Sequence, residues 1–78
     1  MITVKLKYFG QIAEKAGIDE EQLTLVSPNL NTLIKDLSQK YDLTKLNFSV
    51  AINRAQVTTN VTLKNNDEVA LLPPFAGG

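Results

Sequence analysis

The fold is decided near the end of the chain by the run Val69-Ala70-Leu71-Leu72, which is apolar at every position and is followed directly by Pro73 and Pro74. An unbroken apolar run bounded by turn-forming residues predicts a central strand with neighbours on both sides. The two prolines remove two successive backbone donors, so the strand must end there. We therefore expect the last strand of this chain to lie inside a sheet.

The beginning of the chain predicts a strand over residues 2–9, because one face of it carries Ile2, Val4, Leu6 and Tyr8. A short helix over residues 11–16 follows, and Gly17 ends it in the usual C-terminal position. Asp19-Glu20-Glu21 is expected to form an acidic turn before a second strand that carries Leu23 and Leu25. The connection is short, which predicts antiparallel pairing of these two strands.

The middle of the chain contains the strongest helical period. Asn29 is a suitable N-cap, and apolar residues follow at helical spacing: Leu30, Leu33, Ile34, Leu37 and Tyr41. A third strand is expected over residues 48–52, then a tight turn at Asn53-Arg54 and a short edge segment around Gln56-Val57. Asn66 fits a left-handed turn position before the last strand.

These elements predict an α+β fold in which a mixed sheet is covered by one main helix plus a short helix. We expect residues 1–72 to form a single domain and residues 73–78 to form an extended tail. Lys5 and Lys7 point away from the core. They either meet an acidic partner surface or are solvated strand lysines that discourage edge pairing. Phe9 either covers the first helix or contributes to an exposed apolar patch.

The composition excludes several classes of function. The chain has 78 residues and no net charge, so it lacks the electrostatic signature of a nucleic-acid or anionic-membrane binder. No apolar run reaches the ~20 residues that a bilayer span needs. Cys and His are absent, which removes disulfides, thiolate nucleophiles and the commonest metal ligand and general base. We expect a cytoplasmic protein that binds no metal or cofactor itself, and the acidic residues have no metal-like spacing.

The tail is the most informative candidate for function. It reads Pro73-Pro74-Phe75-Ala76-Gly77-Gly78. Extended at ~3.1 Å per residue, it would project roughly 20 Å from the body. Its last two residues have no side chains, so both sides of the backbone can contact the walls of a narrow site on another protein. The terminal carboxylate of Gly78 is the group expected to react. Phe75 is either a docking anchor or folds back on the core, and Arg54 is expected to be solvated rather than part of an interface ion pair.

Several stretches give the chain a resemblance to the small, sulfur-carrying subunits of molybdopterin synthase, within the ubiquitin-like β-grasp sulfur carriers. The resemblance covers essentially the whole chain, and the stretches that carry it are Tyr8-Phe9-Gly10, Glu14-Lys15-Ala16-Gly17, the Leu33/Leu37 helix, Val50-Ala51-Ile52-Asn53, Asn66-Asp67-Glu68-Val69-Ala70 and the end from Leu71 to Gly78. The family commonly has Gly where Asn66 stands and Val where Phe75 stands. Asn tolerates a left-handed turn and Phe keeps an apolar anchor.

The resemblance implies a ubiquitin-like β-grasp fold and a sulfur-carrier function. It implies that an E1-like adenylyltransferase and sulfurtransferase uses ATP to adenylate Gly78, which then becomes a thiocarboxylate. It further implies that residues 73–77 insert into the large subunit of molybdopterin synthase. There the sulfur passes to a cyclic pyranopterin precursor in molybdenum cofactor biosynthesis. The catalytic residues are expected on the large subunit, and the active form is expected to be a hetero-oligomer. A thiocarboxylate is an anionic nucleophile that needs no neighbouring base.

Three alternatives remain open. One is a carrier for another sulfur pathway, such as thiazole synthesis for thiamine, although those relatives tend to be shorter at the first helix and lack the Pro-Pro tail. Another is a ubiquitin-like protein modifier, in which Gly78 is joined to lysines of target proteins. The last is a passive interaction domain whose Gly-Gly end is incidental. Only that last class would tolerate removal of Gly78.

Overall fold

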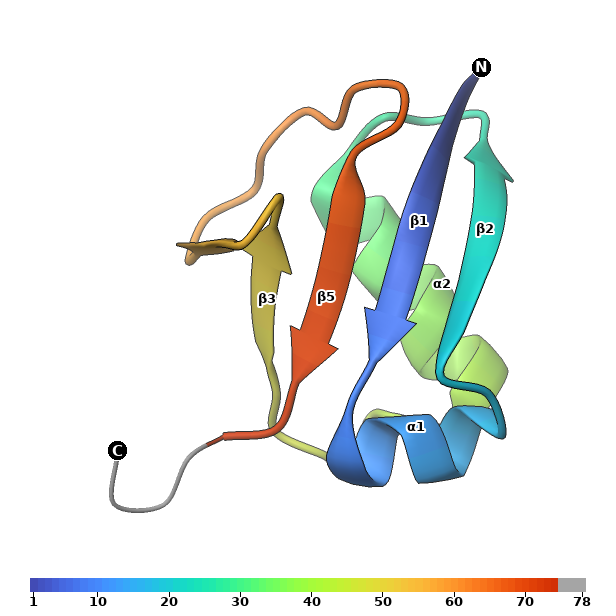
Figure 1. Cartoon of the computed structure of the whole chain (residues 1–78), viewed down its shortest axis with the longest axis vertical. Coiled ribbons are helices and arrows are strands. Elements are labelled where there is room, and N and C mark those ends of the chain that lie inside the picture. Colours follow the sequence, from blue (N-terminus) through green and yellow to red (C-terminus); the bar gives the residue numbers. More distant parts are fainter. Residues whose placement is uncertain (75–78) are drawn as a thin grey trace.

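The computed structural model describes residues 1–74, and Phe75, Ala76, Gly77 and Gly78 lie outside the described residues. Its elements follow the order predicted from the sequence (Figure 1): β1 (Ile2–Tyr8), α1 (Gly10–Ala16), β2 (Glu20–Leu25), α2 (Leu30–Tyr41), β3 (Ser49–Ile52), β4 (Ala55–Val57) and β5 (Glu68–Leu72). Local signals start and end them as expected. The Asn29 side chain accepts a hydrogen bond from the Thr32 amide at 3.1 Å, and Gly17 ends α1 in the left-handed conformation.

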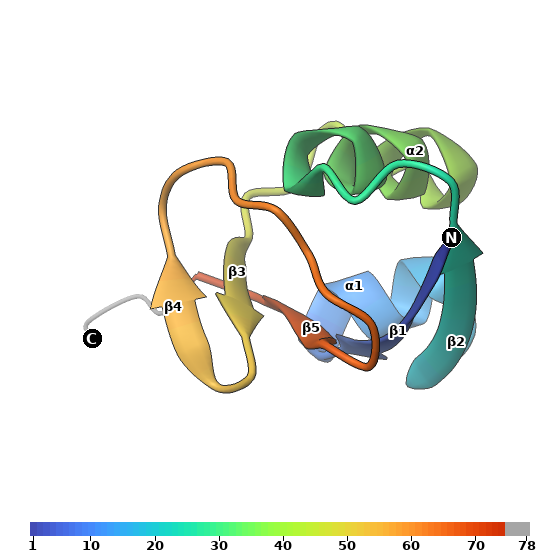
Figure 2. The same cartoon turned by 90° about the horizontal axis from the view of Figure 1, so that it is seen from above.

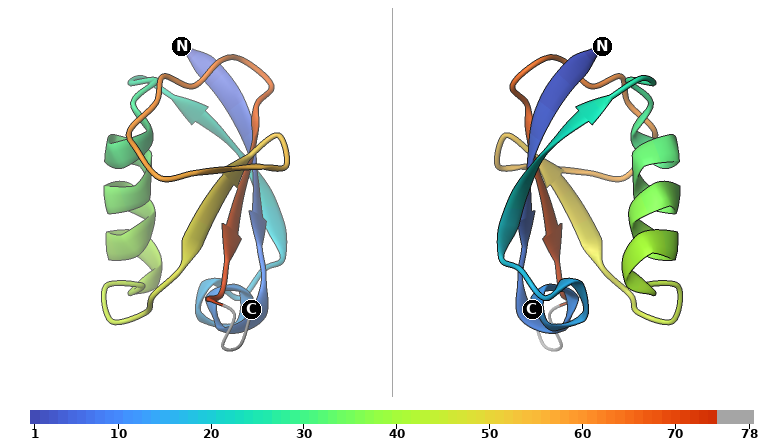
Figure 3. Two further views of the ribbon diagram at one scale, coloured as in Figure 1. Left: turned by 90° about the vertical axis from the view of Figure 1, so that its left-hand side faces the viewer. Right: turned by 90° about the vertical axis from the view of Figure 1, so that its right-hand side faces the viewer.

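The strands form a five-stranded sheet in the order β2-β1-β5-β3-β4. β5 pairs parallel with β1 and antiparallel with β3, and the remaining pairs are antiparallel. Thus the expectation that residues 69–72 form a central strand is confirmed, and so is the mixed sheet. α2 lies along one face of the sheet, and α1 lies across the end at which β1 and β5 finish (Figures 2 and 3).

The core lies between the sheet and α2. Side chains of β1 alternate as predicted, so that Val4, Leu6 and Tyr8 are buried. The stripe of α2 that faces them includes Leu30, Leu33 and Leu37, each 3% exposed or less. Amphipathic spacing in both elements therefore places the apolar faces against each other. Neither helix in residues 1–74 is long and apolar enough to cross a membrane.

Two details differ from the sequence-based expectations. Glu20 and Glu21 do not form a turn, because they pair with Lys7 and Leu6 as the first residues of β2. The ladder extends to Asp19, whose carbonyl oxygen accepts a hydrogen bond from the Tyr8 amide at 2.8 Å. The hypothesis that Lys5 and Lys7 discourage pairing at a sheet edge is also wrong. These lysines belong to β1, which lies between β2 and β5 and has no free edge.

Turn positions that need a left-handed backbone fall where they were expected. Asn66 has a φ of 72° just before β5, as predicted. The tight turn between β3 and β4 has positive φ at both Asn53 and Arg54, at 52° and 71°. Arg54 is exposed there. This pattern is that of a two-residue hairpin turn, which usually selects Asn followed by Gly.

Candidate functional site

The chain leaves the sheet at the end of β5, between the neighbouring strands β1 and β3. Leu71 is fully buried and pairs with Tyr8 of β1 and Val50 of β3. Leu72 makes the last pairing, with Ser49. Pro73 is half-buried and Pro74 is exposed. The chain therefore passes from the middle of the core to solvent within four residues, at a sheet position fixed from both sides (Figure 1).

The site predicted from the sequence is described only in part. Pro73 and Pro74 lie at the root of the tail, directly after β5, as expected. Phe75, Ala76, Gly77 and Gly78, whose carboxylate is expected to react, lie outside the described residues, so their expected roles remain predictions.

The root of the tail has a close neighbour that sequence reasoning missed. Gly10, at the β1–α1 junction, has a φ of +58°, and a Cβ built on it would lie 3.1 Å from the Cγ atom of Pro73. The preceding residue, Phe9, is 43% exposed, so it does not serve only to cover α1. The Tyr8-Phe9-Gly10 stretch was noted in the sequence, but its contact with Pro73 depends on the pairing of β1 with β5.

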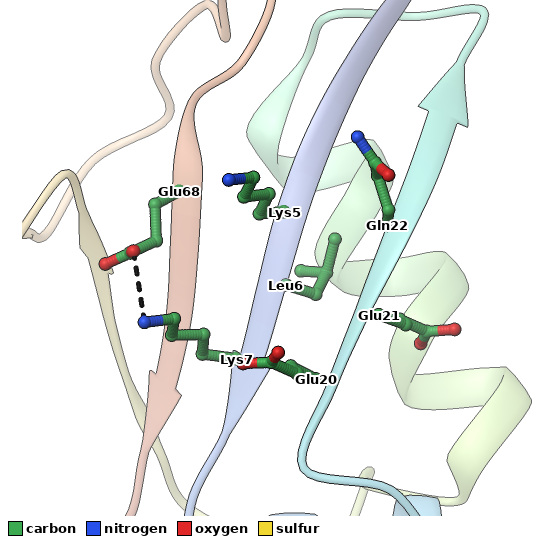
Figure 4. A pocket seen from close by; sticks show the side chains of 7 residues that line it. All are labelled: Lys5, Leu6, Lys7, Glu20, Glu21, Gln22 and Glu68. Carbon is green, nitrogen blue, oxygen red and sulfur yellow. Dashed lines mark ion pairs between the residues drawn. The ribbon is translucent and has the colours of Figure 1, made fainter.

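The outer face of the sheet bears a shallow, open hollow of about 370 Å³ (Figure 4). Across it, Lys7 Nζ lies 3.3 Å from Glu68 Oε1, and Glu20 and Gln22 of β2 line the opposite side with Lys5 between. These lysines point away from the core, as predicted. The hollow is lined by charged side chains and the Gln22 amide, with no serine or threonine hydroxyl among its lining residues. Among residues 1–74 no group of three or more carboxylates could hold a metal ion.

Glu21 points away from this hollow, toward α2 (Figure 4). Its Oε2 atom accepts hydrogen bonds from Tyr8 and Tyr41, each at 2.5 Å, and Lys40 Nζ lies 3.8 Å from its other oxygen. The two tyrosine rings meet edge to face, with centroids 5.7 Å apart. We call Tyr8, Glu21, Lys40 and Tyr41 the tyrosine–carboxylate cluster.

The cluster has a distinct electrostatic character. Burial alone would raise the pKa of Glu21, but the hydrogen bonds from Tyr41 and Tyr8 and the charge of Lys40 outweigh it and lower that pKa below its ordinary value. Burial, and then the bond to the Glu21 carboxylate, raises the pKa of Tyr8 far above the usual range. The cluster therefore holds one anion between neutral phenols, which suits anchoring of β1 to α2. The sequence did contain a signal for the inward position of Glu21. Residues alternate between the two faces of a strand, and Glu21 shares a face with Leu23 and Leu25.

Comparison with known proteins places this arrangement in a family. The profile of the ThiS family matches residues 6–78. The chain is similar to the molybdopterin synthase sulfur carrier subunit of Haemophilus influenzae, with 34% identity over 91% of this chain and 94% of that protein.

Solved structures agree with the fold. A Pyrococcus furiosus protein provisionally named molybdopterin converting factor, subunit 1, has a TM-score of 0.86 at 25% identity, over 96% of this chain and 100% of that one. Subunit 1 in a Helicobacter pylori complex of subunits 1 and 2 of molybdopterin-converting factor has a TM-score of 0.74 at 27% identity, over 99% and 100%. The small archaeal modifier protein 1 of Methanosarcina acetivorans has a TM-score of 0.79 at 26% identity, over 100% and 98%.

Proposed function

The chain belongs to the ThiS family of ubiquitin-like β-grasp proteins, and we propose that it is the sulfur carrier subunit of a molybdopterin synthase. The observation that carries this proposal is the exit of the chain from the central strand. β5 is fixed on both sides, and Pro73 and Pro74 lead directly from it toward a Gly77-Gly78 end. A rigid body thus delivers a slim carboxyl terminus to a site on another protein.

The proposed chemistry takes place at the Gly78 carboxylate. One carboxylate oxygen attacks the α-phosphorus of ATP, the bond between the α-phosphorus and its bridging oxygen breaks, and pyrophosphate leaves. A sulfur nucleophile at the oxidation level of sulfide then attacks the acyl carbon, AMP leaves, and a thiocarboxylate remains. Its sulfur attacks a carbon of the pterin precursor, and as the carbon–sulfur bond forms, the bond from that carbon to an oxygen substituent breaks and the oxygen leaves with the bonding electrons. Water finally cleaves the acyl–sulfur bond, which leaves the sulfur on the acceptor and regenerates the carboxylate.

The other catalytic groups are proposed to come from partners, because the chain contains no Cys and no His to supply a nucleophile or a base near neutral pH. The first partner is an E1-like activating enzyme that binds the ATP. The second is the large synthase subunit, a partner that the Helicobacter pylori complex of subunits 1 and 2 supports. The active form is then a hetero-oligomer, and the expected cellular compartment is the cytoplasm.

A protein modifier is the second candidate function, and the likeness to the Methanosarcina acetivorans modifier supports it. Both functions share the adenylate, and they differ in the nucleophile that follows. A carrier ends with sulfur on Gly78, whereas a modifier ends with an amide bond to a lysine of a target. The thiazole pathway is not favoured, because the similar curated proteins are named molybdopterin synthase subunits.

The mass of the intact protein isolated from its native host tests the proposal. A carrier population should include molecules heavier by the difference between one sulfur and one oxygen atom, located at the last residue, and should co-purify with a pterin-binding subunit. Removal of Gly78, or addition of one residue after it, should abolish the mass shift while leaving the circular dichroism spectrum unchanged. A mass shift that persists in the extended variant would contradict activation at the terminus. Covalent conjugates to lysines in place of the shift would favour the modifier.

A further inference from the structure

We propose that Gly10 is a positioning residue for sulfur transfer, because the absence of a side chain there lets the β1–α1 junction lie directly against Pro73 and set the direction in which the tail leaves the sheet. This inference rests on the proposed carrier function, since it concerns delivery of the Gly78 sulfur. Gly10 does not touch the reacting atoms in this proposal. It acts through Pro73.

The contact at Gly10 is too close for a side chain unless a neighbour shifts. A Cβ atom at this position would lie 3.1 Å from Pro73 Cγ, 3.6 Å from Pro73 Cβ and 3.8 Å from Pro73 Cδ. The first distance is shorter than the usual contact of ~3.5–4.0 Å between carbon atoms. An added methyl group must therefore displace either the β1–α1 junction or Pro73 by a few tenths of an ångström.

The junction is held more firmly than Pro73. On one side of it Tyr8 is 2% exposed, donates its amide hydrogen to the Asp19 carbonyl at 2.8 Å and bonds to Glu21 through its hydroxyl. On the other side Ile12 is 1% exposed and its amide bonds to the Phe9 carbonyl at 3.1 Å. Buried, close-packed groups resist displacement.

Pro73, in contrast, follows the last ladder pair of β5, is only half-buried and is followed by the exposed Pro74. We therefore expect the added methyl group to move Pro73. Two successive prolines have restricted φ and restrict the residue before them, so little of this displacement is absorbed at the root. The direction in which the chain leaves Pro74 therefore changes.

Gly17 is a matched control. It also has a left-handed backbone, with a φ of +76°, but a Cβ on it would meet nothing within 4 Å. Gly10→Ala and Gly17→Ala therefore carry a similar backbone penalty, and only the first touches the tail root. Both variants should lose thermal stability through this backbone penalty, and Gly10→Ala should lose somewhat more because of its contact with Pro73.

The test is a double-mutant cycle on the full-length chain, loaded as the thiocarboxylate and mixed with saturating large subunit, with the single-turnover rate of sulfur transfer as the readout. A misplacement near 1 Å costs a reaction about 100-fold, so Gly10→Ala should slow transfer about tenfold. Gly17→Ala should change the rate less than about twofold. Pro73→Ala removes the 3.1 Å contact and leaves the one at 3.6 Å, so in that background Gly10→Ala should cost less than about twofold. An equal loss in both backgrounds, or a Gly10→Ala rate equal to that of Gly17→Ala, overturns the inference.

A second readout is independent of the carrier function. The carbon resonances of Pro73 should shift in Gly10→Ala and stay in place in Gly17→Ala. If the parent chain transfers no sulfur yet these resonances shift, the proposed function fails while the displacement stands. If the parent transfers sulfur and the resonances do not shift, the positioning role fails alone. Gly10→Asn, which tolerates a left-handed backbone better, serves as the side-chain-bearing variant if Gly10→Ala folds poorly.

Discussion

Replacement of Glu21 by glutamine should destabilise the protein by a predictable amount. Tyr8 and Tyr41 both donate to one oxygen of this carboxylate. A hydrogen bond to a charged group contributes about 1.5–3 kcal/mol, against about 0.5–1.5 kcal/mol for a neutral one. The amide oxygen can still accept both bonds, so Glu21→Gln loses only the difference, about 1 kcal/mol for each bond and about 2 kcal/mol in all. For a domain of this size, that corresponds to a fall in Tm of about 10 °C.

The pH dependence of this difference follows from the direction of the pKa shift. Folding lowers the pKa of Glu21, so its contribution is fully present above the pKa of the unfolded chain, near 4.3, and is lost as the pH falls through the lower folded pKa. The contributions of the other carboxyl groups cancel between the parent and the variant. The gap between them should therefore be widest near neutral pH and shrink at about pH 3.

Urea titrations followed by circular dichroism at the two pH values measure this gap. Glu20→Gln is the matched control, because the same chemical change is made at the adjacent, exposed position on the opposite face of β2. It should change the free energy of unfolding by less than about 0.5 kcal/mol. A gap that is as wide at low pH as at neutral pH, or a Glu20→Gln variant as unstable as Glu21→Gln, would refute the role assigned to the carboxylate charge.

Three further substitutions test other contacts. Arg54→Gly should raise the free energy of unfolding by about 0.5–1 kcal/mol in thermal denaturation, because glycine adopts a φ of 71° without the steric penalty that a side chain brings. An equal gain in Arg54→Ala would show that the backbone is not the cause. Asp67→Ala should lower the free energy of unfolding in urea titrations by about 1–2 kcal/mol. The Asp67 carboxylate accepts hydrogen bonds from the Lys64 amide at 2.8 Å and from the Asn53 side chain at 3.0 Å. An unchanged urea midpoint would argue against a stabilising role for these bonds. Lys7→Gln should change stability by less than about 0.5 kcal/mol, because its pairing with Glu68 at 3.3 Å is partly solvated; a larger loss would mean that the outer face contributes to the fold.

The fold could be predicted from local patterns to a large extent. The apolar run of residues 69–72 and the prolines after it specify a central strand that ends at a defined point. The spacing of Leu30, Leu33 and Leu37 specifies the buried face of α2. These signals are contained within short windows of sequence, so period and turn chemistry are enough to interpret them.

The site was harder to predict because its contacts join distant segments. Tyr8, Glu21 and Tyr41 meet only once the β1–β2 register and the packing of α2 are fixed. Likewise, Gly10 reaches Pro73 through the parallel pairing of the first and last strands. A cluster of acidic residues usually indicates a solvated turn. Here β2 begins at Glu20, so its alternation leaves Glu20 exposed and places Glu21 on the partly buried face. The reactive role of Gly78 stays a prediction that rests on the sequence and its resemblance, because that residue lies outside the described residues.

The parallel pairing of β1 with β5 also has a consequence for biosynthesis. The middle of the sheet stays vacant until Glu68–Leu72 has left the ribosome, so the residues before this strand cannot complete the sheet by themselves. Contacts between residues so far apart along the polypeptide also make folding slower than in a helical bundle of equal length. A partner that recognises the completed sheet would therefore recognise only those copies in which Glu68–Leu72 has already been inserted between β1 and β3.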